Sequence, residues 1–273
     1  MCEIGKKFSN IQYYNKEMQK GMEDKLFFVD KLPNNQKYTF VDFGCADGSM
    51  INALTSIFEG SYNKYIGYDI SETMIDLAKT NYHGPVNANV IFTSKWDDIK
   101  KELEWTNICT EYKSVLILSS VIHEVYSYAK DSTDIAIFWN RVLNSNFDYI
   151  VIRDMCPSDD IDRGSDIYIE TKIKDKANHN YLDEFENEWG KILNNRNLIH
   201  FLLKYRWKIN WNRELHENYF PITIQILIEK FENYNIDYFE RFRVPFLEKC
   251  WKEDFDVEIN DYTHIKAIFT KKK

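Results

Sequence analysis

The first 156 residues alternate short apolar runs with amphipathic stretches. The apolar runs have the length and the β-branched and aromatic content of strands, and they cover 38–43, 65–68, 89–93, 113–118 and 148–154. Between them, apolar residues recur at helical spacing over 50–58, 71–80, 97–104 and 135–142. Because strand and helix alternate, the pattern predicts an α/β fold built on a doubly wound parallel sheet with right-handed crossovers.

The remaining segments have weaker patterns. An apolar stripe over 14–32, ended by Pro33, predicts an amphipathic helix. Near the end of the chain we expect a helix over 222–231 and strands over 240–246 and 264–270. The segment between, residues 157–220, lacks the rhythm of a sheet, and its apolar residues from Leu182 to Leu203 predict one long helix.

Composition narrows the class of protein. The 273 residues, 44% of them hydrophobic, suffice for one large domain or for a domain with an insertion. No apolar run reaches the ~18 residues of a membrane span, and the first residues do not resemble a secretory leader. Five cysteines without paired spacing favour a cytoplasmic protein, and no zinc-site spacing suggests a metal. The net charge of −8 argues against indiscriminate nucleic-acid binding but leaves room for a local basic face.

Two consecutive strand ends carry the clearest chemical signal. The first strand ends in Asp42 and enters a small-residue turn, Gly44-Cys45-Ala46-Asp47-Gly48, that runs into a helix. About twenty residues later the second strand ends in Asp69. Such a turn lets backbone approach a ligand closely, and a carboxylate at the next strand end can accept both hydroxyls of a ribose. The pair predicts a site for an adenosine-containing ligand.

A dinucleotide fits this turn poorly. The G-x-G-x-x-G fingerprint would fall on Gly44, Ala46 and Ser49, so two of its three glycines are missing. Asp47 also places a negative charge at the helix start, where a pyrophosphate requires positive charge. The zwitterionic tail of an amino acid tolerates that acid better.

The turn resembles motif I of the class I S-adenosylmethionine (SAM) dependent methyltransferases, roughly D/E-x-G-x-G-x-G. Gly44 and Gly48 match, and Ala46 replaces the usual middle glycine. The following 67–79 resembles the second strand and helix of that family. The resemblance covers 38–156, and more loosely 222–273, and implies a mostly parallel seven-stranded sheet formed by residues 1–156 and 221–273. It also implies that the helical insertion 157–220 is a lid over the acceptor pocket.

The resemblance also implies cofactor-binding residues: Tyr14, Asp42, Gly44, Ala46, Gly48, Asp69, Ile70, Met74, Trp96, Asp97 and Ser119. Asp69 would accept the ribose hydroxyls, while Asp42 would orient the turn or meet the amino group of the cofactor. Trp96 would lie on the adenine and Asp97 accept from its amino group, although Trp96 could equally be core packing. Tyr14 could face the sulfonium, with core or surface tyrosine as the alternative.

The loop after the fourth strand faces the transferred methyl in the resembling family. It contains His123, a candidate general base, and Glu124, a second candidate. Alternatively, His123 caps the loop or packs under the cofactor. Arg153 and Asp154, at the end of the fifth strand, are expected on the substrate side of the same edge.

Within the insertion, cations alternate with aromatic residues between Glu188 and Glu214. This pattern suits a phosphate-bearing or RNA acceptor, or else an amphipathic lid whose aromatic rings form its core. Trp211 and Arg213 are candidate acceptor-binding residues.

The sequence thus predicts a cytoplasmic SAM-dependent methyltransferase acting on an O or N atom of a small metabolite, with no membrane partner. An RNA methyltransferase and a catalytically silent SAM-binding regulator stay open as alternatives, as does the oligomeric state.

Overall fold

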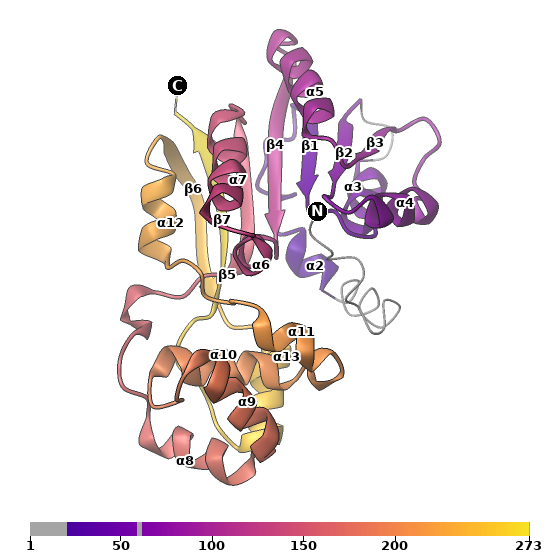
Figure 1. The fold of residues 1–273 in the computed structure, drawn as a ribbon. Coiled ribbons are helices and arrows are strands. Elements are labelled where there is room, and N and C mark those ends of the chain that lie inside the picture. The colour runs from indigo at the N-terminus through magenta and orange to yellow at the C-terminus, as the bar shows by residue number, and fades with distance from the viewer. Residues whose placement is uncertain (1–20, 59–61, 273) are drawn as a thin grey trace. The chain divides into compact units, whose positions relative to one another are not determined.

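The sheet of the computed structural model has seven strands in the order β3-β2-β1-β4-β5-β7-β6 (Figure 1). The structure describes residues 21–58 and 62–272, so the predicted contact of Tyr14 lies outside the described residues. The strands are β1 (Lys37–Phe43), β2 (Lys64–Tyr68), β3 (Asn89–Thr93), β4 (Tyr112–Ser119), β5 (Tyr149–Met155), β6 (Tyr234–Phe242) and β7 (His264–Lys271).

The first five strands are parallel, whereas β7, which lies between β5 and β6, runs in the opposite direction. β1 pairs in parallel with β2 and β4, β2 with β3, and β4 with β5. Near the end of β7, the Lys271 amide donates to the Asp148 carbonyl just before β5, and the Lys272 amide to the Asn233 carbonyl just before β6. β7 therefore runs antiparallel to both. The mostly parallel, doubly wound, seven-stranded fold predicted from the sequence is confirmed.

The chain divides into two compact units that share the long strands β5, β6 and β7. Unit 1 comprises residues 1–154, 231–239 and 266–273, and unit 2 comprises 155–230 and 240–265. The second unit is larger than the predicted insertion 157–220, because a later helix and the adjoining strand segments pack with it.

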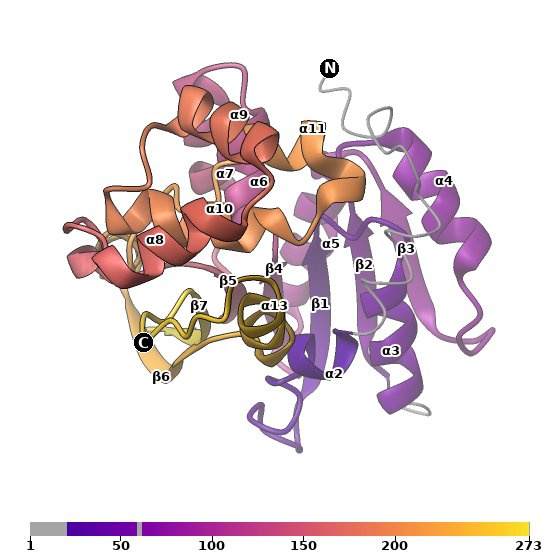
Figure 2. The ribbon, with the colours of Figure 1, turned by 90° about the horizontal axis from the view of Figure 1, so that it is seen from below.

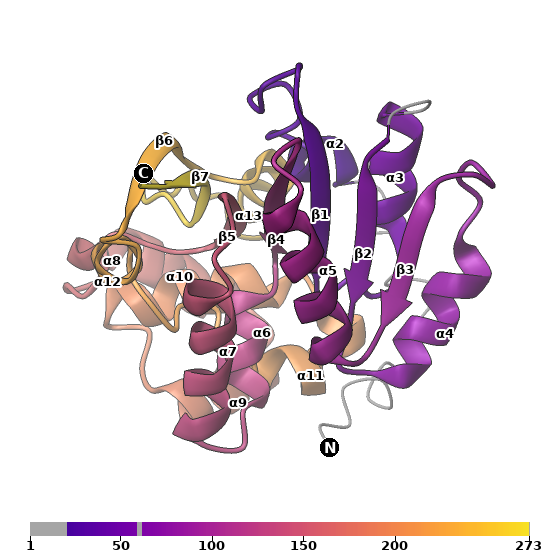
Figure 3. The same ribbon diagram turned by 90° about the horizontal axis from the view of Figure 1, so that it is seen from above.

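Unit 1 covers the sheet with helices on both faces. They are α2 (Met22–Lys25), α3 (Ser49–Ile57), α4 (Glu72–Asn81), α5 (Trp96–Ile108), α6 (Ile122–Tyr128) and α7 (Ser132–Asn144). Figures 2 and 3, from opposite ends, place α2 and α3 on one face of β1 and β4, and α5 and α7 on the other. Strand β4 is buried on both faces, as its uninterrupted apolar run predicts.

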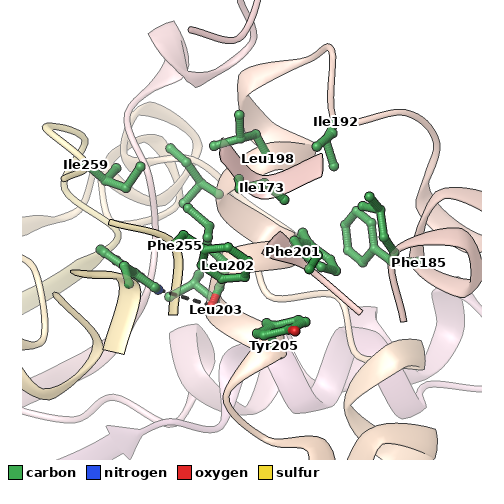
Figure 4. Packing of buried hydrophobic residues seen from close by; sticks show 14 of the residues in the cluster. Ile173, Phe185, Ile192, Leu198, Phe201, Leu202, Leu203, Tyr205, Phe255 and Ile259 are labelled. Carbon is green, nitrogen blue, oxygen red and sulfur yellow. Dashed lines mark hydrogen bonds between the residues drawn. The ribbon is translucent and has the colours of Figure 1, made fainter. Parts of the chain in front are cut away.

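Unit 2 is helical, with α8 (Ile167–Lys176), α9 (His179–Trp189), α10 (Asn195–Tyr205), α11 (Trp211–His216), α12 (Ile224–Lys230) and α13 (Pro245–Phe255). Its core is a cluster of aromatic and branched side chains from α8, α9, α10 and α13. Phe201 and Tyr205 of α10 lie beside Phe255 of α13 and Phe185 of α9 (Figure 4). This unit therefore has an apolar core of its own.

Three predicted elements were wrong in extent. The helix expected from Leu182 to Leu203 is two helices, because Gly190 takes a φ of 92° after α9 and Asn194 caps α10. The strand expected over 240–246 begins earlier, at Tyr234, and Pro245 opens helix α13. The described part of the N-terminal helix ends at Lys25, although Leu32 of the same stripe is buried in the core.

No helix among residues 21–58 and 62–272 is both long and apolar enough to span a bilayer.

Candidate active site

The turn after β1 is held in a shape that glycine alone adopts without strain. Gly44 and Gly48 both have a φ of 79°. A Cβ on Gly44 would lie 2.8 Å from Val121 Cγ2, and one on Gly48 would lie 3.1 Å from Ala78 Cβ. The backbone of the turn therefore packs directly on the loop after β4 and on α4. The Gly44 and Cys45 amides donate to the Tyr68 carbonyl at 2.7 and 2.9 Å, which fixes the turn to the end of β2.

Ala46 also adopts a left-handed conformation, with a φ of 46°. This explains why a glycine is usual at this position, because a Cβ in that conformation has a steric cost. The Ala46 amide points at the end of β2 and donates to Asp69 Oδ2 at 3.1 Å. A strained alanine thus joins the two strand ends that the sequence singled out.

Asp69 lies where the sequence placed it, against the turn. Its Oδ1 accepts from the Ser71 amide at 2.9 Å, while Oδ2 accepts from Ala46. Burial raises the pKa of Asp69, and the two backbone hydrogen bonds oppose that rise. Each carboxylate oxygen has a second lone pair, so the group can still accept from two hydroxyls. Its assignment to a ribose stays a prediction.

The other residues predicted near the adenosine have mixed surroundings. Ile70, directly after Asp69, is 57% exposed, whereas Met74 is buried in α4. Trp96 is 7% exposed, and its ring packs at 5.6 Å from the Tyr68 ring and 5.9 Å from the Phe43 ring. These contacts favour the interpretation of Trp96 as core packing.

Asp97 is exposed at the start of α5 and forms an ion pair with Lys100 at 3.0 Å. Together with Trp96 and Arg141 it lines a groove of about 950 Å³ between α5 and α7. That groove does not include Gly44 or Asp69 among its lining residues. The predicted role of Asp97 toward an adenine stays a prediction.

Asp42 is a buried carboxyl at the end of β1. In the parallel register Asp42 lies opposite Gly67 of β2 and Ile117 of β4, so its side chain shares a sheet face with that of Ser119, two residues further along β4. Burial raises its pKa to about 7; Asp69 and Asp47 raise it too, whereas Lys25 opposes the rise. Asp47 instead stabilises the start of α3, because its Oδ1 accepts a hydrogen bond from the Ser49 amide.

Ser119, at the end of β4, has an unsatisfied hydroxyl. Among the described residues its Oγ is buried and has no hydrogen-bond partner. A buried polar atom without a partner is costly, by about 1–3 kcal/mol, and such atoms in native structures call for an explanation such as a ligand. Ser119 was predicted to contact the cofactor, and its orphaned hydroxyl is compatible with that.

His123 and Asp154, predicted separately, form a buried pair. His123 Nδ1 lies 2.6 Å from Asp154 Oδ1, and the two side chains are 7% and 2% exposed. Asp154 Oδ2 accepts from the Val121 and Ile122 amides at 2.9 and 2.7 Å. A carboxylate only accepts, so His123 Nδ1 is the donor, and in the neutral imidazole the lone pair is then on Nε2. Asp154 thus orients His123, a role the sequence did not indicate. Glu124 follows in the first turn of α6 and is half-buried.

Arg153, predicted on the substrate side, forms an ion pair with Asp24 of α2. Its Nη2 lies 2.7 Å from Asp24 Oδ2, and its Nη1 donates to Ser120 Oγ at 3.2 Å. Lys266 Nζ lies 2.5 Å from the other oxygen, Asp24 Oδ1. Burial opposes the effect, but these two cations hold the pKa of Asp24 below its usual value. Arg153 therefore fastens α2 to the ends of β4 and β5.

Lys25, which the sequence did not single out, is brought to the site by α2. Its side chain is buried. Burial lowers the pKa of Lys25 to about 8 and Arg153 lowers it further, whereas Asp42, Asp47 and Glu124 oppose the shift. Figure 1 shows α2 beside the arrowheads of β1 and β4. Helical periodicity could not assign this lysine to the site, because periodicity only indicates that position 25 lies on the apolar face of the helix.

The two candidate acceptor residues of unit 2 are in its interior. Trp211 is buried, and its Nε1 donates to Glu184 Oε2 at 2.6 Å. Arg213 is buried beside two acids, with Nη2 at 2.8 Å from Glu217 Oε1 and Nη1 at 3.7 Å from Glu214 Oε1. Their predicted contact with an acceptor stays untested.

The basic and aromatic residues around them are largely core as well. Phe201, Tyr205 and Lys204 are buried, and Lys204 Nζ donates to the carbonyls of Glu214 and Glu217. Arg196 forms a two-point ion pair with Asp162, and Lys191 pairs with Glu186. This arrangement favours an apolar helical core over a continuous stacking surface.

No family model matches the chain, and no curated protein matches it in sequence. Solved structures do resemble it. The O-methyltransferase family protein from Burkholderia thailandensis superposes with a TM-score of 0.50 at 10% identity, over 95% of this chain and 59% of that chain. Magnesium protoporphyrin IX methyltransferase from Synechocystis PCC 6803, with bound SAH, gives 0.48 at 11% identity, over 97% of this chain and 90% of that one.

A pericyclic reaction enzyme gives a TM-score of 0.43 at 10% identity, over 92% of this chain. This chain spans about half of that enzyme, 47% of its length. At such identities the likeness concerns the fold alone. Two observations point to the same fold: the strand order with its antiparallel β7, and the superposition on the Burkholderia protein. The chain has the class I fold of the SAM-dependent methyltransferases.

Proposed function

We propose that the protein is a SAM-dependent methyltransferase acting on an oxygen or nitrogen atom of a small metabolite. One observation carries this proposal: the buried His123–Asp154 pair lies at the ends of β4 and β5, at the same carboxyl edge of the sheet as the Gly44–Gly48 turn after β1. An orientated imidazole at the carboxyl edge of a class I fold is suited to take a proton from an acceptor.

The residues at this edge fit the cofactor. Gly44 keeps the left-handed turn packed on Val121, and such a glycine turn at a strand end lets backbone approach a ligand closely. Asp69 has spare lone pairs for a ribose, and Ile70 offers exposed apolar surface beside it. The orphaned Ser119 hydroxyl and the buried carboxyl of Asp42 supply polar contacts for the amino-acid part.

When bound, SAM supplies an electrophilic methyl group on a sulfonium sulfur. The protein's part is to align the acceptor and to manage its proton. Positioning of this kind can contribute up to ~7–11 kcal/mol. Nε2 of His123 accepts the acceptor's proton, and Asp154 stabilises the imidazolium that forms through its hydrogen bond to Nδ1. The amides of Val121 and Ile122 hold Asp154 in place, so the pair keeps its geometry.

A small acceptor is favoured over RNA by the surroundings of the basic and aromatic residues in unit 2. Phe201, Tyr205 and Trp211 are buried, so these rings do not form a stacking surface. We place the protein in the cytoplasm because of its cysteine usage, and we propose no membrane partner.

Methyl-labelled SAM, incubated with the protein and fractionated cell extract, tests this function. We expect label in the small-molecule fraction, and a loss of at least roughly a hundredfold with His123→Ala at unchanged SAM affinity. Label in RNA would contradict the small-molecule acceptor and indicate an RNA methyltransferase. Tight SAM binding without transfer in any fraction would instead indicate a silent SAM-binding protein.

A further inference from the structure

A polar groove lies between α5 and α7, on the face of the sheet that these two helices cover (Figure 3). Its volume of about 950 Å³ is within the range of small-molecule sites. All of its lining residues belong to unit 1. Gly44, Asp69 and His123 are not among them, so the turn, the ribose carboxylate and the proposed base lie outside its walls.

Arg141 of α7 is the most deeply set cation of the groove, because it is half-buried whereas the lysines of the groove are exposed. Its guanidinium carbon lies 5.2 Å from the centre of the Trp96 ring, and its Nη1 donates to the Tyr68 hydroxyl at 3.1 Å. A guanidinium carries five N–H donors. Within residues 21–58 and 62–272, Arg141 makes this one hydrogen bond and no ion pair, so four donors are left for a ligand.

Two acids of the groove are balanced by lysines of their own helix. Lys100 Nζ lies 3.0 Å from Asp97 Oδ1, and Lys101 Nζ lies 3.9 Å from Asp98 Oδ1. The other charged residues that line the groove have no ion-pair partner in the described part of the chain; they are Lys95, Arg141 and Glu104.

The two unpaired cations lie at one end of the groove, and the unpaired acid lies away from them. Lys95 directly precedes Trp96, on whose ring Arg141 packs. From Lys95 to Glu104 the helix rises by about 13 Å, at ~1.5 Å per residue. The groove therefore has a cationic end, at which a half-buried guanidinium and a lysine meet without a balancing carboxylate.

A planar guanidinium packed on an aromatic ring and left without a carboxylate can hold an oxyanion by two parallel hydrogen bonds. A second cation beside it favours a doubly charged anion. We propose that the groove between α5 and α7 is a second ligand site, which binds a phosphorylated small molecule by its phosphate group through Arg141 and Lys95. Asn140 and Asn144 are exposed on the α7 wall and face hydroxyl groups of the same ligand; their mutual hydrogen bond uses one polar group of each.

The competing explanation is that Arg141 only fixes Tyr68. The Tyr68 carbonyl accepts from the Gly44 and Cys45 amides, so a residue that fixes Tyr68 also supports the turn after β1. On that explanation the protein has no affinity for phosphate in the groove, and Lys95 has no part in the role of Arg141. Binding of phosphate that requires both cations separates the two explanations.

A phosphate titration followed by NMR tests the proposal without SAM or an acceptor. Trp96 lines the groove, and its indole N–H signal, assigned with Trp96→Phe, reports a ligand there. We expect inorganic phosphate, and more strongly ribose 5-phosphate, to shift that signal saturably, whereas chloride at equal ionic strength leaves it in place. Arg141→Gln should weaken phosphate binding at least tenfold, the equivalent of one charge-assisted hydrogen bond. Lys95→Met should weaken it about threefold.

Lys130→Met is the matched control, because Lys130 is exposed just before α7 and does not line the groove. It removes the same charge and should leave phosphate affinity unchanged. Tyr68→Phe keeps both groove cations and should retain phosphate affinity within threefold. The absence of a saturable shift in the wild type, or equal affinity in the wild type, Arg141→Gln and Lys95→Met, would overturn the proposal.

Repeating the titration with saturating SAM separates this site from the cofactor site. We expect the phosphate affinity to stay within threefold. Complete loss of the phosphate-dependent shift would overturn the assignment of a second site, because the groove would then belong to the nucleoside pocket. Phosphate binding in a protein that does not bind SAM would support the groove and count against the proposed function alone.

Discussion

Asp154 accepts a hydrogen bond from His123 Nδ1 at 2.6 Å, and its second oxygen receives two backbone amides from the loop that carries the histidine. The carboxylate is thereby fixed by the start of α6, the helix whose histidine it orients. This relationship connects β4 and β5 at the carboxyl edge of the sheet. Under the proposed function, Asp154 positions the base His123; the acceptor contact expected for Asp154 from the sequence stays a prediction.

Replacing Asp154 by Asn should reduce methyl transfer while sparing SAM affinity. An amide can accept through only one atom, so it cannot satisfy both the loop amides and His123 Nδ1, and the tautomer is no longer fixed. We expect single-turnover rates to fall by roughly 10²–10⁴, with the SAM dissociation constant within threefold. A uniform loss of rate and affinity would show that the pair is structural.

Gly44→Ala should remove cofactor binding and destabilise the protein. The new Cβ would lie 2.8 Å from Val121 Cγ2, in a backbone conformation with a φ of 79°. Such strain costs on the order of 1–3 kcal/mol. Gly164→Ala is the control, because a Cβ there meets nothing within 4 Å. Thermal unfolding and SAM titration of both variants check this, and an unperturbed Gly44 variant would contradict the description of the turn.

Asp42→Asn should stabilise the protein at alkaline pH. The folded pKa of Asp42 is raised to about 7 from 3.8, by burial, Asp69 and Asp47 against the opposing charge of Lys25. Between those values the folded state binds more protons than the unfolded state, so this group lowers stability as pH rises through the interval. Above about pH 8 the cost is fully present and amounts to no more than about 4 kcal/mol.

The wild-type protein and the Asp42→Asn variant should therefore have similar unfolding free energies near pH 4 and diverge toward pH 8, with the variant more stable. Denaturant unfolding at both pH values measures this difference. A variant that is less stable at pH 8 would show that ionised Asp42 contributes to the fold.

Lys204→Met should destabilise unit 2. Lys204 is fully buried and donates to the carbonyls of Glu214 and Glu217, and burial lowers its pKa while raising that of Glu214. Removing the ammonium leaves the two carbonyls without their donor and the nearby acids without a counter-charge. We expect this to lower the free energy of unfolding by roughly 3–5 kcal/mol. Lys208→Met, at an exposed position of the same segment, is the control. Equal melting temperatures for the two variants would contradict the network.

Much of the fold could be predicted because periodicity and turn chemistry are local. The strands of the parallel half were found from apolar runs, and Asp42, Gly44 and Asp69 from their places at strand ends. Strand β6 was misplaced since most of its residues are exposed or half-buried at the sheet edge, which removes the apolar signal. The helix α13 was missed because Pro245, its first residue, was taken as part of a strand.

The site was less predictable than the fold. Which side chain faces which depends on tertiary packing, and no local pattern indicates that Asp154 bonds to His123 or that Asp24 anchors α2. Arg153, Trp211 and Arg213 were chosen as polar or aromatic residues near a ligand edge. The structure gives each of them ion-pair or hydrogen-bond partners that sequence spacing does not reveal.

Calorimetric titration of the wild-type protein and Asp69→Ala with SAM, and separately with NAD, tests the central claim most directly. The claim is that the ends of β1 and β2 hold a sulfonium nucleoside. We expect one SAM site, an affinity loss of more than tenfold in the variant, and no binding of NAD. Saturable NAD binding that depends on Asp69, without SAM binding, would contradict it.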